Sequence, residues 1–375
     1  MKFIIATQEL NFALSKIQHV VAAKSTIPIL GNVLIEAYND EIVITATDLT
    51  VGVRYVMEAK ILQEGATTLP AKKLAQLVRE LTVPHLEVST NANDVTEIIA
   101  GASKFKLNGM NKDEFPSLPD MEGSIHFSIK QSDLKDMFYR TAFAVSREDN
   151  RFVLTGVYLK IENGVATFIG TDGKRLSRIQ KAISIDSEFK SGYIIPLKAV
   201  DEILKNLTEE GEAKVALMQD KIAVEASGTT IVSKLLAGDY PDVNRVIPPS
   251  PSTVVTLHRE ELMALLRQIS LFTADTSHSV KFTFSPGELT LAANTSEIGE
   301  GSVKMPVDYR GNKLEIAFNP NFYLDILRHC KHERVLLGVE DPFNPGVITD
   351  QEEAPIVTSS PVPLFVLMPM RLSEE

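Results

Sequence analysis

Apolar side chains recur at helical spacing at three places in the chain, roughly 125 residues apart. Residues three or four positions apart are apolar in each place, which puts them on one face of an amphipathic helix. The three sets are Leu10, Leu14, Ile17 and Val21; Leu134, Phe138 and Thr141; and Leu262, Leu266 and Ile269. Because this period is too long for a solenoid repeat, it indicates three domains of one fold.

A second helical pattern repeats at the same spacing and follows a proline-containing segment in each copy. Its apolar positions are Leu74, Leu77 and Leu81; Val200, Ile203 and Leu207; and Tyr323, Ile326 and Leu327. Each domain is therefore predicted to consist of two half-units, each with one helix and several strands.

Short β-rich runs separate the predicted helices. We expect strands at 33–37, 41–47, 52–57, 153–161, 165–170 and 281–284, and a last buried strand in the first half of 363–372. Such runs with only two helices per copy favour antiparallel sheets. The predicted fold class is α+β, with two helices on antiparallel sheets in each domain. Proline-rich joins place the domains at 1–121, 122–249 and 250–375.

Length and composition support this organisation. A chain of 375 residues exceeds what one core normally supports, and 44% hydrophobic with 23% charged residues is typical of globular proteins. No apolar run approaches the roughly 18 residues that span a bilayer, and the first residues turn polar too soon for a secretory signal. We expect a cytoplasmic protein without membrane contact. The single cysteine, Cys330, is expected to be a packed, passive thiol.

The net charge of −11 would ordinarily argue against nucleic acid as a partner. The six predicted helices, however, hold 13 Lys or Arg and 9 Asp or Glu, and so carry +4. If the helices share one side, that side would attract a polyanion; alternatively they are ordinary solvated helix faces. Three equal domains related by similar rotations form an arc, which a second chain could close into a ring lined by twelve helices.

The glycine-containing segment 170–176 is the first candidate for chemistry. It suggests a phosphate cradle and hence a nucleotide-dependent enzyme, but its glycines are too close for a P-loop and Arg175 stands where Ser or Thr is needed. A tight turn that presents Lys174 and Arg175 is the alternative. His329 and His332 could offer two metal ligands, but no acidic or cysteine ligand adjoins them, so solvated helix residues are favoured.

No catalytic centre is recognisable, and neither a cofactor nor a metal is expected. The carboxyl end contains the pattern Met368-Pro369-Met370 within an apolar segment. Pro369 cannot continue a central strand, and two flexible methionines suit an adaptable groove for an apolar peptide.

Four segments in order carry a resemblance to a known family: 27–32, 171–176, 240–246 and 368–372. Through them the chain resembles the bacterial DNA polymerase III beta subunits, the replicative sliding clamps, along essentially its whole length. The resemblance implies a head-to-tail homodimeric ring of three DNA-clamp domains per chain, without catalytic activity, which a clamp loader closes around DNA using ATP. It also implies sequence-independent binding of double-stranded DNA, and partners that include the DNA polymerase III alpha subunit, the clamp loader, other polymerases and repair proteins.

The resemblance assigns roles residue by residue. The implied DNA contacts are Lys24, Lys72, Arg79, Arg147 and Lys198. The implied partner-peptide groove comprises Leu154, Thr171, Gly173, Lys174, Arg175, Leu176, Pro241, Arg245, Val246, Asn319, Phe322, Val366, Met368, Pro369, Met370, Arg371 and Leu372. The implied dimer interface joins Lys73 and Phe105 of one chain to Leu271 and Phe272 of the next.

Overall fold

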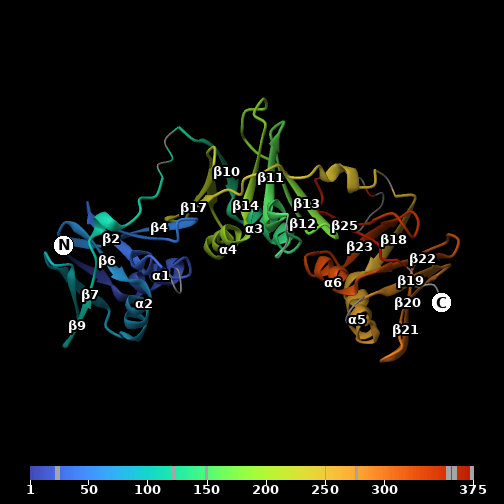
Figure 1. Cartoon of the computed structure of the whole chain (residues 1–375), viewed down its shortest axis with the longest axis horizontal. Helices are drawn as coiled ribbons and strands as arrows, with labels where there is room; N and C mark the ends of the chain where they lie inside the picture. The colour runs from blue at the N-terminus through green and yellow to red at the C-terminus, as the bar shows by residue number, and fades with distance from the viewer. Residues whose placement is uncertain are drawn as a thin grey trace. The chain divides into compact units, whose positions relative to one another are not determined.

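The structure is a computed structural model of the chain (Figure 1). It describes residues 1–21, 26–119, 121, 123–147, 151–249, 251–274, 278–351, 356 and 361–371. The α-helices within these ranges are α1 (Thr7–Ile17), α2 (Ala71–Glu80), α3 (Gln131–Ala142), α4 (Leu197–Asn206), α5 (Arg259–Ile269) and α6 (Pro320–Arg328). All six helices predicted from the apolar spacing are therefore confirmed.

Each helix forms because its apolar stripe has a surface to cover. In α1, Leu10, Leu14 and Ile17 are buried, and in α2, Leu74 and Val78 are buried. The two helices pack on each other, and α5 packs on α6 in the same way. Burial of one face explains why short helices are stable here, since isolated helices of this length are marginal in water.

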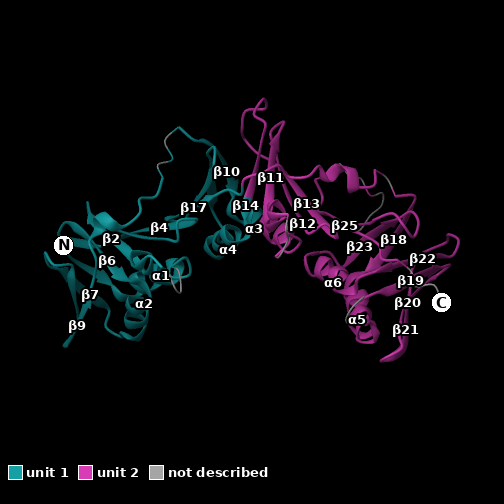
Figure 2. Ribbon diagram, in the orientation of Figure 1, with its two compact units in different colours: residues 1–135, 195–236 teal, residues 136–194, 237–375 magenta. Residues whose placement is uncertain are grey.

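The chain divides into two compact units (Figure 2). Unit 1 comprises residues 1–135 and 195–236, and unit 2 comprises residues 136–194 and 237–375. Unit 1 contains two antiparallel sheets. The five-stranded sheet has the order β5 (Lys60–Gln63), β1 (Lys2–Ala6), β7 (His85–Thr90), β8 (Val95–Ala100) and β9 (Ser103–Asn108). The eight-stranded sheet has the order β10 (Ile125–Lys130), β15 (Glu212–Leu217), β16 (Lys221–Ala226), β17 (Thr229–Lys234), β4 (Val51–Glu58), β3 (Glu41–Thr47), β2 (Asn32–Tyr38) and β6 (Gly65–Pro70).

Unit 2 repeats this plan. Its eight-stranded sheet has the order β14 (Ser191–Pro196), β11 (Gly156–Glu162), β12 (Val165–Thr171), β13 (Arg175–Ala182), β25 (Leu364–Leu367), β24 (Gly346–Thr349), β23 (Arg334–Val339) and β18 (Thr253–His258). Its four-stranded sheet has the order β21 (Gly299–Pro306), β20 (Glu288–Thr295), β19 (Val280–Ser285) and β22 (Leu314–Phe318). The core between these sheets and α5 and α6 is rich in aromatic side chains, among them Phe282, Phe318 and Tyr323.

Strand pairing joins successive repeats within each unit. In unit 1, β4 of the first repeat pairs with β17 of the second, and in unit 2, β13 of the second repeat pairs with β25 of the third. The second repeat therefore contributes one half to each unit. The half-units predicted from the sequence are real, but each of the two compact units is built from three of them.

Three short segments correct or refine the sequence predictions. Residues 153–155 do not begin a strand, because they belong to the 3-10 helix η3 (Phe152–Thr155). Cys330 follows α6 instead of lying in it, and burial raises the pKa of its thiol, as expected for a passive cysteine. The strand predicted before Met368 is confirmed as β25. Among the helices that the structure describes, none is long and apolar enough to cross a membrane.

Candidate functional site

A tight turn between β12 and β13 forms one wall of the candidate site. The Asp172 carboxylate accepts hydrogen bonds from the backbone N–H of Lys174 (2.9 Å) and of Arg175 (3.0 Å). The Thr171 hydroxyl accepts one from Gly173 N–H (3.1 Å) and donates one to Arg175 O (2.6 Å). Gly173 has φ +82°, a backbone conformation that glycine adopts at low cost. The turn predicted at Asp172-Gly173 is thus confirmed.

The turn also excludes a phosphate cradle of the P-loop type. A P-loop leads from a strand into the amino end of a helix, whose N–H groups bind the phosphate. Here the segment joins two antiparallel strands, β12 and β13, and no helix follows it. The nucleotide-dependent enzyme considered from the sequence therefore has no structural basis in this segment.

The carboxyl-terminal segment lies against this turn. Leu176 pairs with Val366 in the β13–β25 ladder, and Met368 N–H donates to Lys174 O (3.0 Å). Beyond Pro369 the chain turns to β22, where Met370 N–H donates to Ala317 O (2.8 Å). Pro369 ends the strand, as the sequence predicted.

A pocket of about 210 Å³ opens between the turn, β25 and the linker that follows residue 240. Its walls are mostly apolar. Twelve residues line it: Arg151, Leu154, Thr171, Gly173, Arg175, Leu176, Pro241, Asp242, Val243, Val246, Val366 and Met368. Nine of these were expected in a peptide groove. Concave apolar walls with a few polar groups are typical of ligand and peptide sites.

The remaining groove candidates lie outside the lining of this pocket. Lys174, Arg245 and Arg371 are exposed, and the Arg245 guanidinium pairs with Asp242 (3.4 Å). Asn319 caps α6, since its side chain accepts from Asn321 N–H (2.9 Å). The structure places Pro369 and Met370 on the path from β25 to β22 and Phe322 beside Arg175, whereas Leu372 is outside the described residues.

Arg175 connects the turn to α3 and α6. Its guanidinium donates to Asp172 (3.2 Å), to Asp325 of α6 (2.7 Å) and to Phe143 O (3.0 Å). The rings of Phe322 and Phe143 lie 4.7 and 5.3 Å from its Cζ. Because these contacts fix the guanidinium, Arg175 forms a rigid part of the pocket wall.

Three lining residues were not expected from the sequence: Arg151, Asp242 and Val243. Arg151 lies against Gly173, where a Cβ would come within 2.7 Å of its Nη2. Asp242 lies in the segment 240–246, which carries part of the family resemblance, and the buried Val243 follows it directly. No pattern marks Arg151.

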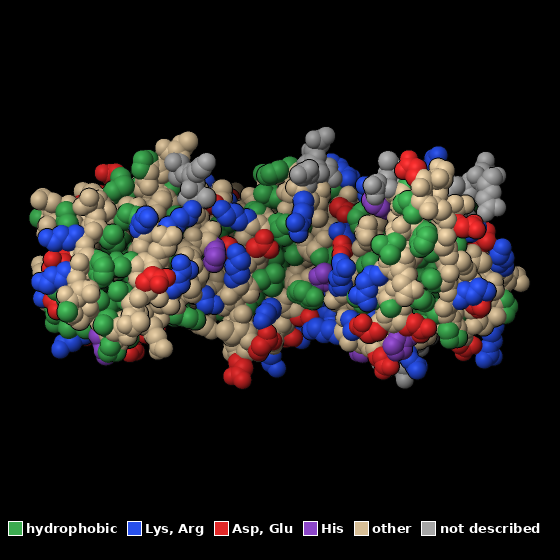
Figure 3. Space-filling model, turned by 90° about the horizontal axis from the view of Figure 1, so that it is seen from below, with side chains coloured by type: hydrophobic (Ala, Val, Ile, Leu, Met, Phe, Trp, Pro, Cys, Tyr) green, Lys and Arg blue, Asp and Glu red, His purple; other side chains and the backbone are tan. Residues whose placement is uncertain are grey.

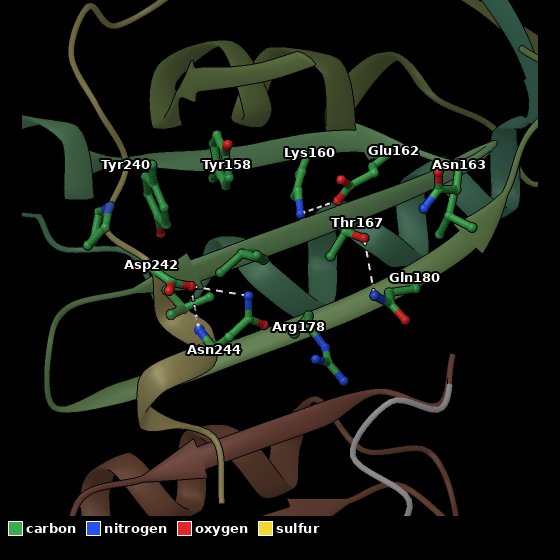
Figure 4. Close-up of a pocket in the computed structure, with 14 residues that line it drawn as sticks. Tyr158, Lys160, Glu162, Asn163, Thr167, Arg178, Gln180, Tyr240, Asp242 and Asn244 are labelled. Atoms are coloured by element: carbon green, nitrogen blue, oxygen red, sulfur yellow. Dashed lines mark hydrogen bonds and ion pairs between the residues drawn. The ribbon is translucent and has the colours of Figure 1, made fainter. Parts of the chain in front are cut away.

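A second pocket, of about 460 Å³, lies on the same sheet and shares Pro241, Asp242 and Val243 with the first (Figure 4). Its walls are largely polar. The Tyr158 and Tyr240 rings stack at 4.5 Å, and Thr167 accepts from the Gln180 amide (3.2 Å). Burial raises the pKa of the Tyr240 hydroxyl. Polar walls of this kind do not suit an apolar peptide, so the smaller pocket is the better candidate.

A buried ionic cluster supports the helices of unit 2 behind the pocket. Arg140 of α3 donates to Asp350 (2.6 Å) and to Asp136 (3.0 Å), and Asp350 also accepts from the backbone N–H of Lys331 and His332 (both 3.0 Å). Burial alone would raise the pKa of Asp350, but these donors outweigh it and hold the pKa below its ordinary value. The cluster therefore stabilises the charged forms of Arg140 and Asp350.

The two histidines considered as metal ligands have different surroundings. The His329 ring stacks on Phe143 at 4.0 Å, and burial lowers the pKa of His329. The prediction of a solvated helix residue is wrong for His329, because it packs among aromatic rings after α6. His332 pairs with Asp350 (3.1 Å). Among the residues that the structure describes, no cluster of three or more His, Cys, Asp or Glu could hold a metal.

The candidate DNA contacts differ in how available their charges are. Lys72 and Arg79 are exposed on α2, and Arg147 is exposed after α3. Lys198 on α4 is exposed but forms an ion pair with Asp48. Lys24 is outside the described residues. In the face viewed in Figure 3, Lys and Arg side chains are scattered among acidic and apolar ones.

The candidate interface residues lie near the edges of the two smaller sheets. Phe105 belongs to β9, an edge strand of unit 1, and Lys73 is exposed on α2. In unit 2, Phe272 packs against Gly301 of the edge strand β21, and the neighbouring Leu271 is 72% exposed. Such an exposed leucine beside an unpaired strand edge is typical of an association surface.

Family models match the chain in three consecutive segments. They describe the amino-terminal domain of the DNA polymerase III beta subunit at residues 1–119, its central domain at 128–242 and its carboxyl-terminal domain at 244–363. The three matches together cover most of the chain, in the order that the repeats predict.

Curated relatives and solved structures agree with these matches. The beta sliding clamp of Chlamydia pneumoniae is 52% identical over 375 residues, with all of both chains covered, and that of Pseudomonas aeruginosa is 30% identical over 99% of this chain and all of its own. The crystal structure of a Pseudomonas aeruginosa sliding clamp bound to griselimycin superimposes with a TM-score of 0.94 at 29% identity, covering 99% of this chain and all of that one. The sliding clamp of Bacillus subtilis gives a TM-score of 0.93 at 25% identity, with 99% of both chains covered.

Proposed function

Because the chain belongs to the bacterial DNA polymerase III beta subunit family, the DNA sliding clamps, we propose that two copies close into a ring around duplex DNA. The protein is a processivity factor and not an enzyme. The ring would tether the polymerase alpha subunit, other polymerases, the clamp loader and repair proteins in the cytoplasm, where the chromosome is replicated. The domain boundaries at 121/122 and 249/250 remain part of this proposal.

The observation that carries the ring is the pairing rule between repeats. The first halves of the three repeats contain the equivalent strands β4, β13 and β21, and the second halves end with β9, β17 and β25. Inside the chain β4 pairs with β17 and β13 pairs with β25. The same rule would pair β21 with β9, and both are edge strands of their sheets. A second copy can satisfy both edges head to tail.

Charge supports this pairing of edges. The β9 strand carries exposed Lys104 and Lys106, whereas Glu297 and Glu300 are exposed at the start of β21. Opposite charges at facing edges favour the correct register and disfavour pairing of two identical edges. Phe105 on one side and Leu271 with Phe272 on the other would supply the apolar centre of the interface.

A small number of exposed cations is suitable for a ring that must move along DNA. Strong phosphate contacts would hold the protein in place. A few weak contacts, which dissolved salt screens, would instead let it slide. Lys72 and Arg147 are exposed for such contacts, Arg79 is exposed but lies 3.9 Å from the Glu80 carboxylate, and Lys198 would first have to exchange its partner Asp48. Retention on DNA would then depend on topology instead of affinity.

The apolar pocket is proposed to receive short apolar segments of the partner proteins. Its lining offers Leu154, Leu176, Val246 and Met368 to apolar side chains, and the backbone around it is fixed by Arg175 and Asp172. A fixed backbone lowers the cost of ordering a bound peptide. Met368 adds adaptability, which suits several partners that share one pocket.

Griselimycin is a practical probe of this pocket, because a similar clamp was solved with it bound. We expect the purified protein to bind griselimycin in calorimetry, and Val246→Glu to weaken binding by placing a carboxylate in an apolar wall. Ile298→Glu, which changes an exposed residue outside the pocket, is the control. If both variants weaken griselimycin binding equally, or if neither weakens it, the assignment of the pocket would be contradicted.

A further inference from the structure

The joint between β4 and β17 in unit 1 (Figure 1) repeats the backbone hydrogen bonds of the candidate groove. Asp48 accepts from Thr50 N–H (2.8 Å) and Val51 N–H (2.7 Å), as Asp172 accepts from Lys174 and Arg175. Thr47 accepts from Leu49 N–H (3.0 Å) and donates to Val51 O (3.1 Å), as Thr171 does in its own turn. The two turns are therefore copies at a spacing of 124 residues.

The neighbouring strands repeat as well. Lys234 N–H donates to Thr50 O (2.9 Å), as Met368 N–H donates to Lys174 O (3.0 Å). Gly52 pairs with Val232 in the same register in which Leu176 pairs with Val366. The 3-10 helix η1 (Pro28–Gly31) supplies a buried Leu30 where η3 supplies Leu154. All the backbone elements of a groove are thus present twice.

The side chains differ at the centre of the joint. Where the groove has Leu176, the first joint has Gly52, and Leu118 of the following linker lies directly over the position that a Cβ would take. Leu118 belongs to the segment 115–119, which corresponds to the segment 240–244 along the groove, since Phe115-Pro116 matches Tyr240-Pro241. The glycine makes room, and the chain's own leucine fills the space.

The rim of the joint keeps the character of a binding surface. Ile27 is 46% exposed and Leu49 is 42% exposed, at the positions that correspond to Arg151 and Gly173. Leu49 has φ +76°, so a non-glycine residue adopts the same left-handed conformation as Gly173. The rim is therefore apolar and shaped like the groove, although its centre is occupied.

We propose that Leu118 is a built-in plug that closes a second copy of the groove and limits each chain to one apolar peptide. The inference rests on the proposed function of the pocket, because it assumes that such a backbone frame binds apolar side chains. Leu118 determines which of two similar joints is available to partners. Removal of its side chain would open the space over Gly52, beside its cross-strand partner Val232, to a peptide.

The test uses a fluorescein-labelled short peptide rich in leucine and phenylalanine, and the full chain in four forms. These are the wild type, Val246→Glu to disable the groove, Leu118→Ala, and the double variant. The double variant is expected to bind the peptide about tenfold more tightly than Val246→Glu alone, and Leu118→Ala to bind two peptides where the wild type binds one. Leu118→Met, which conserves volume, is the control and should leave the joint closed.

The outcomes separate this inference from the function of the groove. If the folded double variant binds the peptide no more tightly than Val246→Glu does, the proposed role of Leu118 is wrong. This conclusion does not depend on the affinity of the wild type. Wild-type binding that Val246→Glu leaves unchanged would instead contradict the groove. Thermal unfolding of each variant shows that it is folded, and a photoreactive peptide should label residues 27–52 in the double variant only if the plug is real.

Discussion

At the scale of single residues, the candidate groove depends on side chains that fix backbone and on side chains that offer apolar surface. Asp172 and Arg175 belong to the first kind, because their hydrogen bonds hold the turn, α6 and the backbone of Phe143. Met368 belongs to the second, since it lines the pocket and remains 39% exposed. The two kinds should respond differently to substitution.

Met368→Ala should weaken partner peptides without affecting the fold. The loss of apolar contact area corresponds to about 1 to 2 kcal/mol, or roughly five- to thirtyfold in affinity. Fluorescence anisotropy with an apolar peptide measures the effect, and Ile298→Ala serves as the matched control. An unchanged affinity would remove Met368 from the site.

Arg175→Lys should lower both stability and peptide affinity. A lysine cannot reproduce donation to Asp172, Asp325 and Phe143 O at once, so we expect a loss of about 1 to 3 kcal/mol in the free energy of unfolding. Urea denaturation followed by circular dichroism measures it. Arg245→Lys, at an exposed position, should leave the free energy of unfolding almost unchanged. Comparable losses of this free energy in the two variants would disprove the role given to Arg175.

Residue roles were only partly predictable from the sequence. The pattern of 171–176 predicted the turn, because Asp-Gly and the preceding threonine specify it locally. It did not predict that Arg175 is held between two aromatic rings, since those rings come from α6 and from the segment after α3. Asn319 was assigned to the groove by resemblance, yet in this structure its side chain caps α6.

At the scale of elements, the position of α3 in unit 2 depends on the Arg140–Asp350 pair. The side chains are 5% and 1% exposed, and Asp350 accepts from two backbone N–H groups at the start of the loop before β23. A buried charge that loses its partner is costly, so this cluster should be sensitive to both mutation and acid.

Asp350→Asn should destabilise unit 2 by about 3 kcal/mol near neutral pH. Because the pKa of Asp350 is lowered in the folded state, the wild-type pair stabilises the fold above the ordinary carboxyl pKa of about 4. That stabilisation is lost as the pH falls through the lowered pKa. Urea unfolding at several pH values should therefore show a gap between wild type and variant that narrows in acid. A gap independent of pH would contradict this account.

Elements were easier to predict than their ends or partners. Apolar spacing located all six helices, because each buries a stripe of its own local sequence. The apolar run at 153–155 was wrongly assigned to a strand, since periodicity cannot distinguish a short strand from a 3-10 turn that buries Leu154. Pairing across the joints, β4 with β17 and β13 with β25, has no local signal and emerges only from the structure.

At the scale of the whole molecule, the proposed ring requires two copies to associate through the edge strands β9 and β21. Phe105→Ala combined with Leu271→Ala should convert a dimer into a monomer of 41.3 kDa, because the apolar centre of the interface is removed. Sedimentation velocity measures the change. Ile125→Ala with Phe343→Ala removes exposed apolar area away from β9 and β21 and should leave the dimer intact. A dimer that persists in the interface variant would rule out these edges.

The most direct measurement compares retention on a nicked DNA circle with retention on the same DNA after linearisation, following loading by a bacterial clamp loader with ATP. A closed ring stays on the circle at salt concentrations that screen phosphate contacts, and slides off the linear ends. We predict long retention on the circle and rapid loss from the linear form. Equal retention on both, with the same dependence on salt, would mean ordinary affinity binding and would contradict the ring.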